Sequence, residues 1–288
     1  MDDVLDKHWV EDLVRAALEE DLAGGVDVTS TATIGEQQRS VADFVARADG
    51  VVAGLEVAEL VLRIAAGADT IEAERQVADG ATVRGGDVLM TVTGPTRQLL
   101  TAERTALNLL CHLSGVATLT ARWVAELDGT GAAVRDTRKT MPLLRSLEKY
   151  AVRCAGGVNH RMSLADAALI KDNHVIAAGG VAEAFVAVRN QFPDVPIEIE
   201  VDTVDDAVAA VEAGAELILL DNMPIEQMRT AVEKVHGRAK LEASGGLTLD
   251  KARAVAETGV DYLAVGALTH SAPVLDIAMD LREQEEEA

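Results

Sequence analysis

Basic side chains recur at successive predicted strand ends in the second half of the chain. They are Arg138, Lys139, Arg161 and Lys171. A guanidinium binds carboxylates or phosphates through two parallel hydrogen bonds, and an ammonium contributes a compact positive charge. Each cation alone could simply form a surface ion pair. Four of them around one opening predict a site for a substrate that carries several negative charges.

Two glycine-containing turns near the end of the chain could bind a phosphate. Ser244-Gly245-Gly246 precedes a predicted helix that starts near Thr248, and Gly266-Ala267 follows one strand later. A tight turn that leads into a helix exposes backbone N–H groups, which bind anions. Either turn alone could be an ordinary tight loop. Together, at the last two strands of an α/β array, they are typical of a phosphate site.

Glu200 and Asp221 lie one strand-helix unit apart. Such a pair could hold Mg²⁺ on a pyrophosphate, or accept hydrogen bonds from sugar hydroxyls and stabilise a developing positive charge on the sugar. The alternative is that these carboxylates neutralise Lys139 and Lys171. Both can hold, because a site rich in cations needs balancing charge.

The elements that must position these residues repeat along the second half of the chain. Strands are predicted at 132–136, 167–171, 197–201, 216–221, 240–244 and 262–266, and helical patterns separate the later ones. This alternation predicts a parallel sheet built from βα units. Glu200, Asp221, Ser244 and Gly266 follow one another at intervals of 21 to 23 residues. They are therefore expected to be equivalent strand ends on the open face of an α/β barrel, where active sites lie.

The first part of the chain has a mixed pattern. Helices are predicted at 9–20 and 55–66, a strand at 41–53, and short strands with tight turns at 77–94. Residues 96–127 read as one long helix, or as two that are broken near Ser114-Gly115.

Composition excludes several classes of function. The 288 residues carry a net charge of −22 and only 2% aromatic residues, which argues against a nucleic-acid binder. No apolar run approaches the length of a membrane span, and the acidic N-terminus lacks a signal-peptide core. Two cysteines do not make a disulfide framework. We expect a soluble cytoplasmic protein. The acidic charge could simply be a well-solvated surface, or, because lysine (seven) is scarce beside arginine (19), it could indicate adaptation to a salty cytoplasm.

The motifs that carry these residues closely resemble the quinolinate phosphoribosyltransferase family, over nearly the whole chain. The most specific series is DTRKT (136–140), GGVNHR (156–161) and KDNH (171–174), which IEIEVD, ILLDNM and LEASGGL then follow. The resemblance implies an N-terminal α/β sandwich domain at 1–115 and an incomplete, open α/β barrel at 116–270. It also implies a C-terminal segment, 271–288, that returns to the N-terminal domain.

The resemblance also implies a reaction and a role for each site residue. The family converts quinolinate and 5-phosphoribosyl-1-pyrophosphate, with Mg²⁺, to nicotinate mononucleotide, pyrophosphate and CO2. Thr137 belongs to the TRKT motif, and Lys139 would lie between the dicarboxylate and the pyrophosphate. Glu200 and Asp221 would contact ribose hydroxyls and Mg²⁺. The quinolinate carboxylates would be held by Arg138, His160, Arg161 and Lys171, and the 5-phosphate by Ser244, Gly245, Gly246, Val265, Gly266 and Ala267. Lys139, Lys171, Glu200 and Asp221 are the residues expected to be catalytic.

Arg104, in AERTALN, resembles a residue that the family inserts into the site of a neighbouring subunit, so a homodimer or a higher homo-oligomer is implied.

Three alternative functions remain at this point. They are a paralogous phosphoribosyltransferase with another acceptor, a Schiff-base aldolase that uses Lys171 or Lys139, and a lipoyl-type carrier module suggested by residues 77–92. The last lacks the expected lysine at a hairpin tip.

Overall fold

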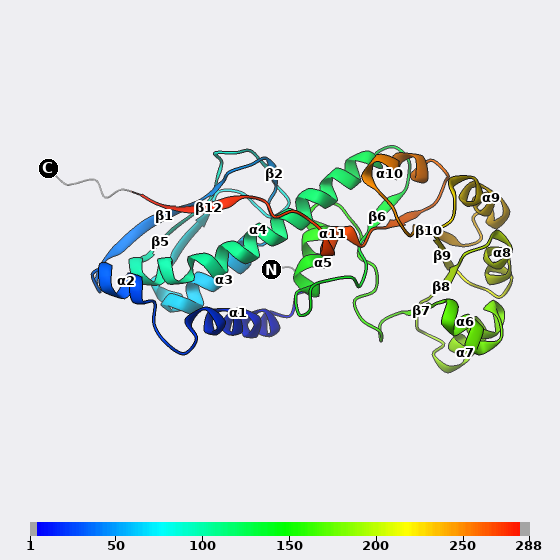
Figure 1. Ribbon diagram of the computed structural model, residues 1–288, viewed down its shortest axis with the longest axis horizontal. Helices are drawn as coiled ribbons and strands as arrows, with labels where there is room; N and C mark the ends of the chain where they lie inside the picture. The colour runs from blue at the N-terminus through cyan, green and yellow to red at the C-terminus, as the bar shows by residue number, and fades with distance from the viewer. Residues whose placement is uncertain (1–4, 283–288) are drawn as a thin grey trace. The chain divides into compact units, whose positions relative to one another are not determined.

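A computed structural model of the chain describes residues 5–282 (Figure 1). The outermost parts of the expected N-terminal domain and C-terminal segment, 1–4 and 283–288, lie outside the described residues. The described chain divides into two compact units. Unit 1 comprises the residues up to Leu119, then Pro142–Ala155, and the C-terminal part from Ala272. Unit 2 comprises Thr120–Met141 and Gly156–Ser271.

Unit 1 is built on an antiparallel sheet with the strand order β12-β1-β5-β3. Helix α3 packs on β5, and α1 packs on α3. The C-terminal strand β12 pairs with β1, in the register Phe44 to Met279. In chain order its elements are α1 (Lys7–Leu22), α2 (Val28–Thr33), β1 (Arg39–Ala46), β2 (Gly50–Val51), α3 (Leu55–Ala66), a 3-10 turn (Ala68–Thr70), β3 (Glu72–Arg75), β4 (Thr82–Val83), β5 (Val88–Pro95), α4 (Thr96–Glu126), α5 (Arg145–Cys154) and β12 (Ile277–Leu281). The part of α4 from Thr120 onward belongs to unit 2.

Helix α4 is continuous, so the break considered near Ser114-Gly115 does not occur. Ser114 is buried, and its hydroxyl bonds to both the N–H and the carbonyl of Ala53, at 3.0 and 3.2 Å. Gly115 faces the segment at Pro273, where a Cβ atom would collide with the Pro273 carbonyl oxygen. The two small residues therefore allow a close approach of backbone to the helix and do not interrupt it.

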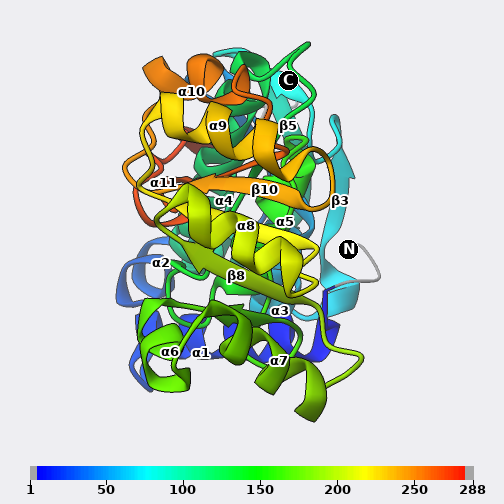
Figure 2. The same ribbon diagram turned by 90° about the vertical axis from the view of Figure 1, so that its right-hand side faces the viewer.

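Unit 2 contains a six-stranded parallel sheet with the order β6-β11-β10-β9-β8-β7. Helices α8, α9 and α10 lie on one side of it (Figure 2). Within the described chain β6 and β7 are the two edge strands and form no ladder with each other, so the predicted open, incomplete barrel is confirmed. The elements are β6 (Ala133–Arg135), β7 (Ala168–Ile170), α6 (Asp172–Ala178), α7 (Val181–Gln191), β8 (Ile197–Val201), α8 (Val204–Glu212), β9 (Leu217–Asp221), α9 (Ile225–Val235), β10 (Lys240–Ser244), α10 (Leu249–Ala256), β11 (Tyr262–Ala264) and α11 (Ala267–His270).

The register of this sheet corrects one expectation. Asp221 is level with Ser244, as predicted, but Glu200 is level with Leu219, two residues before Asp221. Gly266 lies two residues beyond the level of Ser244, because Ala243 pairs with Leu263. Side chains alternate between the faces of a strand, so an offset of two residues keeps these residues on one face at different depths.

Among the described helices, none is long and apolar enough to cross a membrane.

Candidate active site

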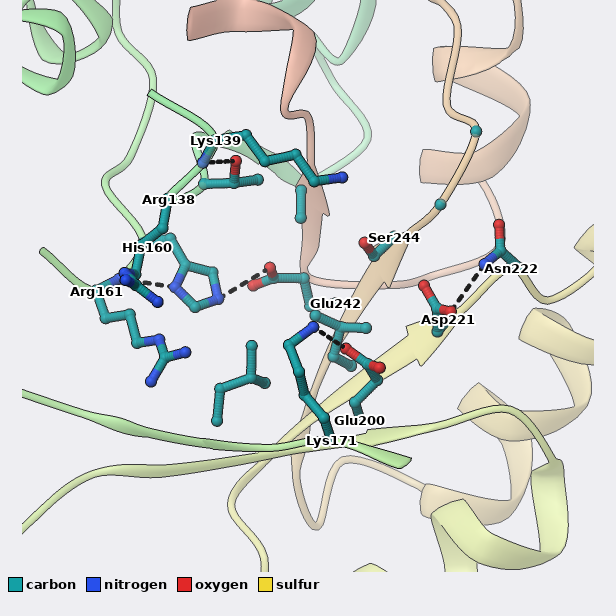
Figure 3. Close-up of a pocket in the computed structure, with 16 residues that line it drawn as sticks. Arg138, Lys139, His160, Arg161, Lys171, Glu200, Asp221, Asn222, Glu242 and Ser244 are labelled. Atoms are coloured by element: carbon teal, nitrogen blue, oxygen red, sulfur yellow. Dashed lines mark hydrogen bonds and ion pairs between the residues drawn. The ribbon is translucent and has the colours of Figure 1, made fainter. Parts of the chain in front are cut away.

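A pocket of about 610 Å³ opens at the carboxyl ends of the unit 2 strands (Figure 3). The polar residues of its lining include most of those predicted for the site. They are Thr137, Arg138, Lys139, His160, Arg161, Lys171, Glu200, Asp221, Ser244, Gly245 and Gly246, joined by Asn222 and Glu242. Leu169, Leu219 and Ala264 supply the apolar part of the wall. The pocket therefore combines cations, carboxylates and exposed backbone, as the strand-end pattern predicted.

Two arginines at one side of the pocket have unused hydrogen-bonding capacity. The Nε atoms of Arg138 and Arg161 are buried and have no hydrogen-bond partner. Arg161 also donates from Nη1 to the carbonyl of Ala167, at 2.9 Å. Burial and the neighbouring positive charge of Arg138 lower the pKa of Arg161. A bound anion would relieve both the repulsion and the lost hydration of this pair.

Lys171 directly follows β7 and forms an ion pair with Glu200 on the adjacent strand, with 3.1 Å between Nζ and Oε2. The Lys171 side chain is half exposed, and its backbone N–H donates to Nδ1 of His174 at 2.9 Å, at the start of α6. The lysine is therefore a fixed, charged group at the mouth of the pocket. A Schiff-base lysine is usually desolvated, whereas the Lys171 side chain is half exposed and paired with a carboxylate.

Lys139 lies in the loop after β6, close to the start of α11. Its backbone N–H donates to Oγ1 of Thr137 at 3.0 Å, and its carbonyl accepts from Oγ1 of Thr269 at 2.8 Å. The side chain passes over Gly266, where a Cβ atom would lie only 2.9 Å from Cδ of Lys139. The loop after β6 and the segment around the start of α11 thus direct this lysine.

The turn after β10 has the shape expected of an anion site. Gly245 and Gly246 have φ values of +91° and +58°, in the left-handed region. A Cβ atom at Gly245 would also collide with the side-chain amide of Asn222. Both residues line the pocket, so their backbone N–H groups lie beside it with no side chains in the way. Val265, Gly266 and Ala267 are not part of this lining; they form the adjacent turn between β11 and α11.

Glu200 and Asp221 both line the pocket from neighbouring strands. Asp221 accepts a hydrogen bond from Nδ2 of Asn222 at 2.7 Å, and Glu200 holds Lys171. Carboxylate oxygens are the ligands that Mg²⁺ prefers, and the ion commonly uses only one or two of them together with substrate phosphates. The donor set therefore fits a magnesium ion brought in with a pyrophosphate.

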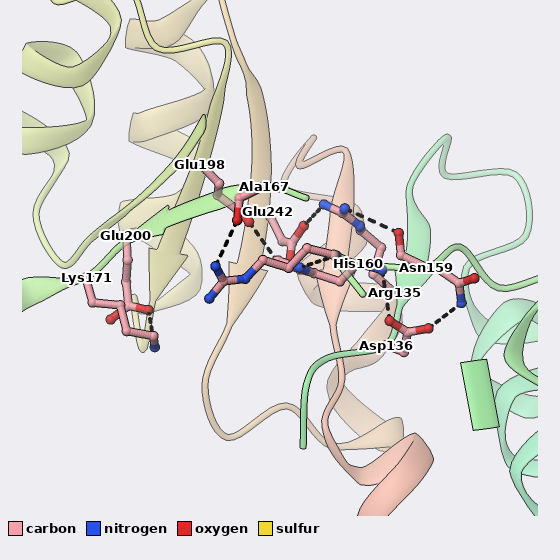
Figure 4. Close-up of polar contacts among 10 residues, drawn as sticks. Arg135, Asp136, Asn159, His160, Ala167, Lys171, Glu198, Glu200 and Glu242 are labelled. Atoms are coloured by element: carbon pink, nitrogen blue, oxygen red, sulfur yellow. Dashed lines mark hydrogen bonds and ion pairs between the residues drawn. The ribbon is translucent and has the colours of Figure 1, made fainter. Parts of the chain in front are cut away.

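A buried cluster at the inner end of the pocket joins His160 to two carboxylates that received no role from the sequence. It consists of His160, Glu198 and Glu242, with Arg135 beside them (Figure 4). Nε2 of His160 is 2.7 Å from Glu198 and 3.6 Å from Oε1 of Glu242. Arg135 forms an ion pair with the other oxygen of Glu242 and stacks on Tyr262. The signal was present in the sequence, because an acidic residue in the middle of a short, doubly buried strand must have a partner.

The tautomer of His160 follows from its two contacts. Nδ1 accepts the backbone N–H of Arg161 at 2.7 Å, so the ring hydrogen is on Nε2 and is donated to Glu198. The three side chains are close enough to share a metal ion. Nε2 of His160 contacts Oε2 of Glu198 and Arg135 pairs with Oε2 of Glu242, whereas Oε1 of each carboxylate is buried without a hydrogen-bond partner. His160, expected to hold a substrate carboxylate, has both ring nitrogens directed at protein groups.

Burial raises the pKa of Glu242 to about 7, and the negative charge of Glu198 adds to this shift. Arg135 and His160 oppose the shift and do not cancel it.

Arg104 belongs to unit 1, on an exposed position of α4, outside the set of residues that line this pocket.

Comparison with known proteins gives consistent matches over both units. Residues 27–114 match the family "Quinolinate phosphoribosyl transferase, N-terminal domain", and residues 116–280 match the C-terminal domain of the same family. The chain is 52% identical over 273 residues to nicotinate-nucleotide pyrophosphorylase (carboxylating) from Mycobacterium leprae, which covers 94% of this chain and 96% of that protein. A probable enzyme of the same name from Methanothermobacter thermautotrophicus is 40% identical, with coverage of 94% and 98%.

Solved structures agree with these matches. Nicotinate-nucleotide pyrophosphorylase from Francisella tularensis superimposes with a TM-score of 0.92 at 34% identity, over 98% of this chain and all of that one. NadC from Streptococcus pyogenes gives 0.91 at 37% identity, over 97% and 99%. The predicted resemblance is confirmed at the level of sequence and of fold: the chain belongs to the quinolinate phosphoribosyltransferase family.

Proposed function

We propose that this chain converts quinolinate and 5-phosphoribosyl-1-pyrophosphate to nicotinate mononucleotide, pyrophosphate and CO2 in NAD biosynthesis, and that the unit 2 pocket is the site of this reaction. The single observation that carries the proposal is the lining of that pocket, in a chain of this family. Paired arginines, a half-exposed lysine, two carboxylates and a glycine turn surround one cavity. Each group matches one charged or hydroxylated part of the two substrates.

The quinolinate carboxylates are assigned to Arg138, Arg161 and Lys171. The unused Nε atoms of the two arginines support this role, since a planar carboxylate can accept two hydrogen bonds from one guanidinium. We assign His160 to the same end of the pocket, where it positions Arg161 through the backbone N–H. Thr137 fixes the loop that carries Arg138 and Lys139.

The second substrate is assigned to the other side of the pocket. Its 5-phosphate would bind the backbone of Ser244-Gly245-Gly246 and of Val265-Gly266-Ala267, and its ribose hydroxyls would bind Glu200 and Asp221. Those two carboxylates would also hold Mg²⁺, partly through the pyrophosphate. Bound magnesium would supply positive charge to the leaving pyrophosphate. Lys139, between the two substrates, would supply more.

The chemistry follows from where charge develops. As the bond from ribose C1 to pyrophosphate lengthens, positive charge grows on the sugar, and the fixed carboxylates of Glu200 and Asp221 stabilise it. The pyridine nitrogen, oriented by the arginines, forms the new bond to C1. The ring then carries a positive charge on nitrogen and accepts the electron pair of the breaking bond between C2 and its carboxylate. The protein's task is to hold two anions together in the geometry for this sequence.

Assembly and location are further parts of the proposal. We assign Arg104 to the site of a neighbouring subunit in a homodimer, on the basis of the AERTALN motif and its exposed position on α4. The acidic composition supports a cytoplasmic location, which cell fractionation would test.

A two-substrate assay tests the proposed reaction. Purified protein with the phosphoribosyl donor, Mg²⁺ and quinolinate should release pyrophosphate and CO2 in equal amounts, and nicotinate in place of quinolinate should give neither. Turnover of nicotinate or another acceptor, with no CO2 from quinolinate, would favour the paralogous phosphoribosyltransferase. Omission of Mg²⁺, with EDTA present, should abolish pyrophosphate release.

A further inference from the structure

The proposed reaction requires a proton that none of the roles assigned above supplies. When CO2 leaves, the bond between C2 and the carboxylate carbon breaks and both its electrons stay on C2. The ring becomes nicotinate mononucleotide only when C2 forms a bond to hydrogen. A donor positioned in the pocket would trap this carbanion before CO2 can recombine with it.

The pocket lining offers few groups that can give up a proton. Guanidinium groups do not lose theirs, so Arg138 and Arg161 are excluded. Lys171 is held in its ion pair with Glu200, and the Nε2 hydrogen of His160 is donated to Glu198. Lys139, assigned to the pyrophosphate, keeps its charge for that group.

Glu242 differs from all of these. It lies at the inner end of the pocket, its side chain is 0% exposed, and its Oε1 has no hydrogen-bond partner. Nε2 of His160 lies 3.6 Å from this oxygen. In the close-up, Glu242 projects between the arginine side of the pocket and the Lys171–Glu200 pair (Figure 3).

We propose that Glu242 is the general acid of the decarboxylation and delivers the hydrogen on Oε1 to C2. The O–H bond breaks as the C2–H bond forms, and Glu242 is left as a carboxylate. Water that enters when the product leaves returns the proton. This inference rests on the proposed placement of quinolinate among Arg138, Arg161 and Lys171.

The surroundings of Glu242 support both states that this role needs. Before the reaction, burial and the negative charge of Glu198 favour the protonated acid, with a pKa raised to about 7. The two carboxylates of quinolinate would add to this effect, because like charges disfavour ionisation. After the transfer, Arg135 on Oε2 stabilises the carboxylate. The groups that face Glu242 are Arg135 from β6, His160 from the loop before β7, Glu198 from β8 and Tyr262 at the paired position of β11, while β9 presents Leu219.

The decisive variant is Glu242→Gln, followed through a single turnover with both pyrophosphate and CO2 measured. Glutamine keeps the size of the side chain and an oxygen for Arg135, and removes only the acidic proton. Pyrophosphate release should stay within about threefold of the wild-type rate. CO2 release should slow by about 100-fold or more, the usual contribution of a general acid, and the undecarboxylated mononucleotide should accumulate. Glu242→Asp should recover part of the CO2 rate.

Lys240→Gln is the matched control. Lys240 lies on the same strand, is largely exposed and pairs with Asp261, so both rates should remain at the wild-type level. Equal slowing of pyrophosphate and CO2 in Glu242→Gln would show a structural role and overturn the inference, as would a normal CO2 rate. A wild-type protein that releases neither product would instead refute the proposed function.

A second measurement does not depend on the variant folding. In the wild-type protein, the single-turnover rate of CO2 release should fall as pH rises from about 6 to 9, because the acid form of Glu242 is lost above its pKa. Pyrophosphate release should not follow the same curve. A CO2 rate that is constant over this range overturns the inference.

Discussion

Single side chains in the pocket of unit 2 are held in states that suit an anionic ligand. Arg138 and Arg161 repel each other across the pocket wall, and burial removes part of their hydration. Lys171 forms an ion pair with Glu200. When the substrates bind, Lys171 can pair with a substrate carboxylate instead, and Glu200 can accept hydrogen bonds from the ribose. The positive charges of Arg138 and Arg161 are thus placed to bind the negative charge of a substrate.

Replacing Arg138 or Arg161 by alanine should raise the KM for quinolinate by about 10- to 1000-fold. Each lost hydrogen bond between charged groups costs about 1.5–3 kcal/mol, and each 1.4 kcal/mol is tenfold in affinity. Steady-state kinetics with each substrate varied in turn would measure it. Arg229→Ala is the control, since Arg229 is a half-exposed residue of α9 outside the pocket. Unchanged kinetics in both variants would refute their assigned role.

At this scale the sequence predicts what lies at strand ends better than what lies inside strands. Arg138, Lys171 and Asp221 stand out because they follow apolar runs and break them. Glu198 and Glu242 stand inside such runs, and only a three-dimensional register reveals that His160 and Arg135 reach them. Their partners are distant in sequence, so no spacing rule could connect them.

Among the elements, the turn after β10 combines two requirements that only glycine meets. Gly245 adopts a left-handed conformation, and the side-chain amide of Asn222 occupies the space where a Cβ atom would be. Its backbone therefore stays close to the end of β9 and beside the pocket.

We expect Gly245→Ala to raise the KM for the phosphoribosyl donor by about tenfold or more, with a smaller effect on quinolinate. The left-handed conformation costs a residue with a Cβ about 1–2 kcal/mol, and the collision with Asn222 must also displace the turn. Gly237→Ala is a matched control, because φ at Gly237 is +71° and a Cβ there meets nothing within 4 Å. The control should lose stability in a thermal melt and keep both KM values. Equal changes in the KM for both substrates would contradict a phosphate role for this turn.

The hydrophobic periodicity of the sequence predicted most helices and strands. It left open whether α4 is continuous, because tertiary contacts at Ser114 and Gly115 determine this. The helix at 55–66 and the six strands of unit 2 lie where the pattern placed them. The possible break in α4 was considered because serine and glycine weaken an isolated helix. Here the backbone around Ala53 and the segment at Pro273 need those small residues, so packing overrides propensity.

At the scale of the whole molecule, the shared site can be tested by mixing two inactive proteins. Arg104→Ala should lose activity with its fold intact, and so should Lys171→Ala. Hybrid dimers of the two should recover up to about a quarter to a half of the wild-type activity, because one of the two sites then has both residues. Differently tagged subunits purified as heterodimers would provide the measurement. No recovery in verified heterodimers would count against a residue shared between subunits.

The net charge of −22 gives a second prediction at this scale. Self-repulsion of an acidic surface is screened by salt, with a Debye length of about 8 Å at physiological ionic strength and about 3 Å at 1 M. Raising KCl from about 0.1 to 1 M should increase the Tm by about 3 °C or more, which corresponds to ~1 kcal/mol for a protein of this size. A Tm that is indifferent to KCl would refute adaptation to a salty cytoplasm.

The alternation along β8 has a consequence for how such a protein can diverge. Glu198 and Glu200 share one face of the strand, whereas Ile197, Ile199 and Val201 lie on the other and are buried. Ile197, Ile199 and Val201 thus pack in the core, while Glu198 and Glu200 provide the charged groups of the same five-residue strand. A substitution at Glu200 would therefore alter the donor side of the pocket while the apolar face keeps β8 packed, whereas one at Glu198 would also leave buried His160 without its partner.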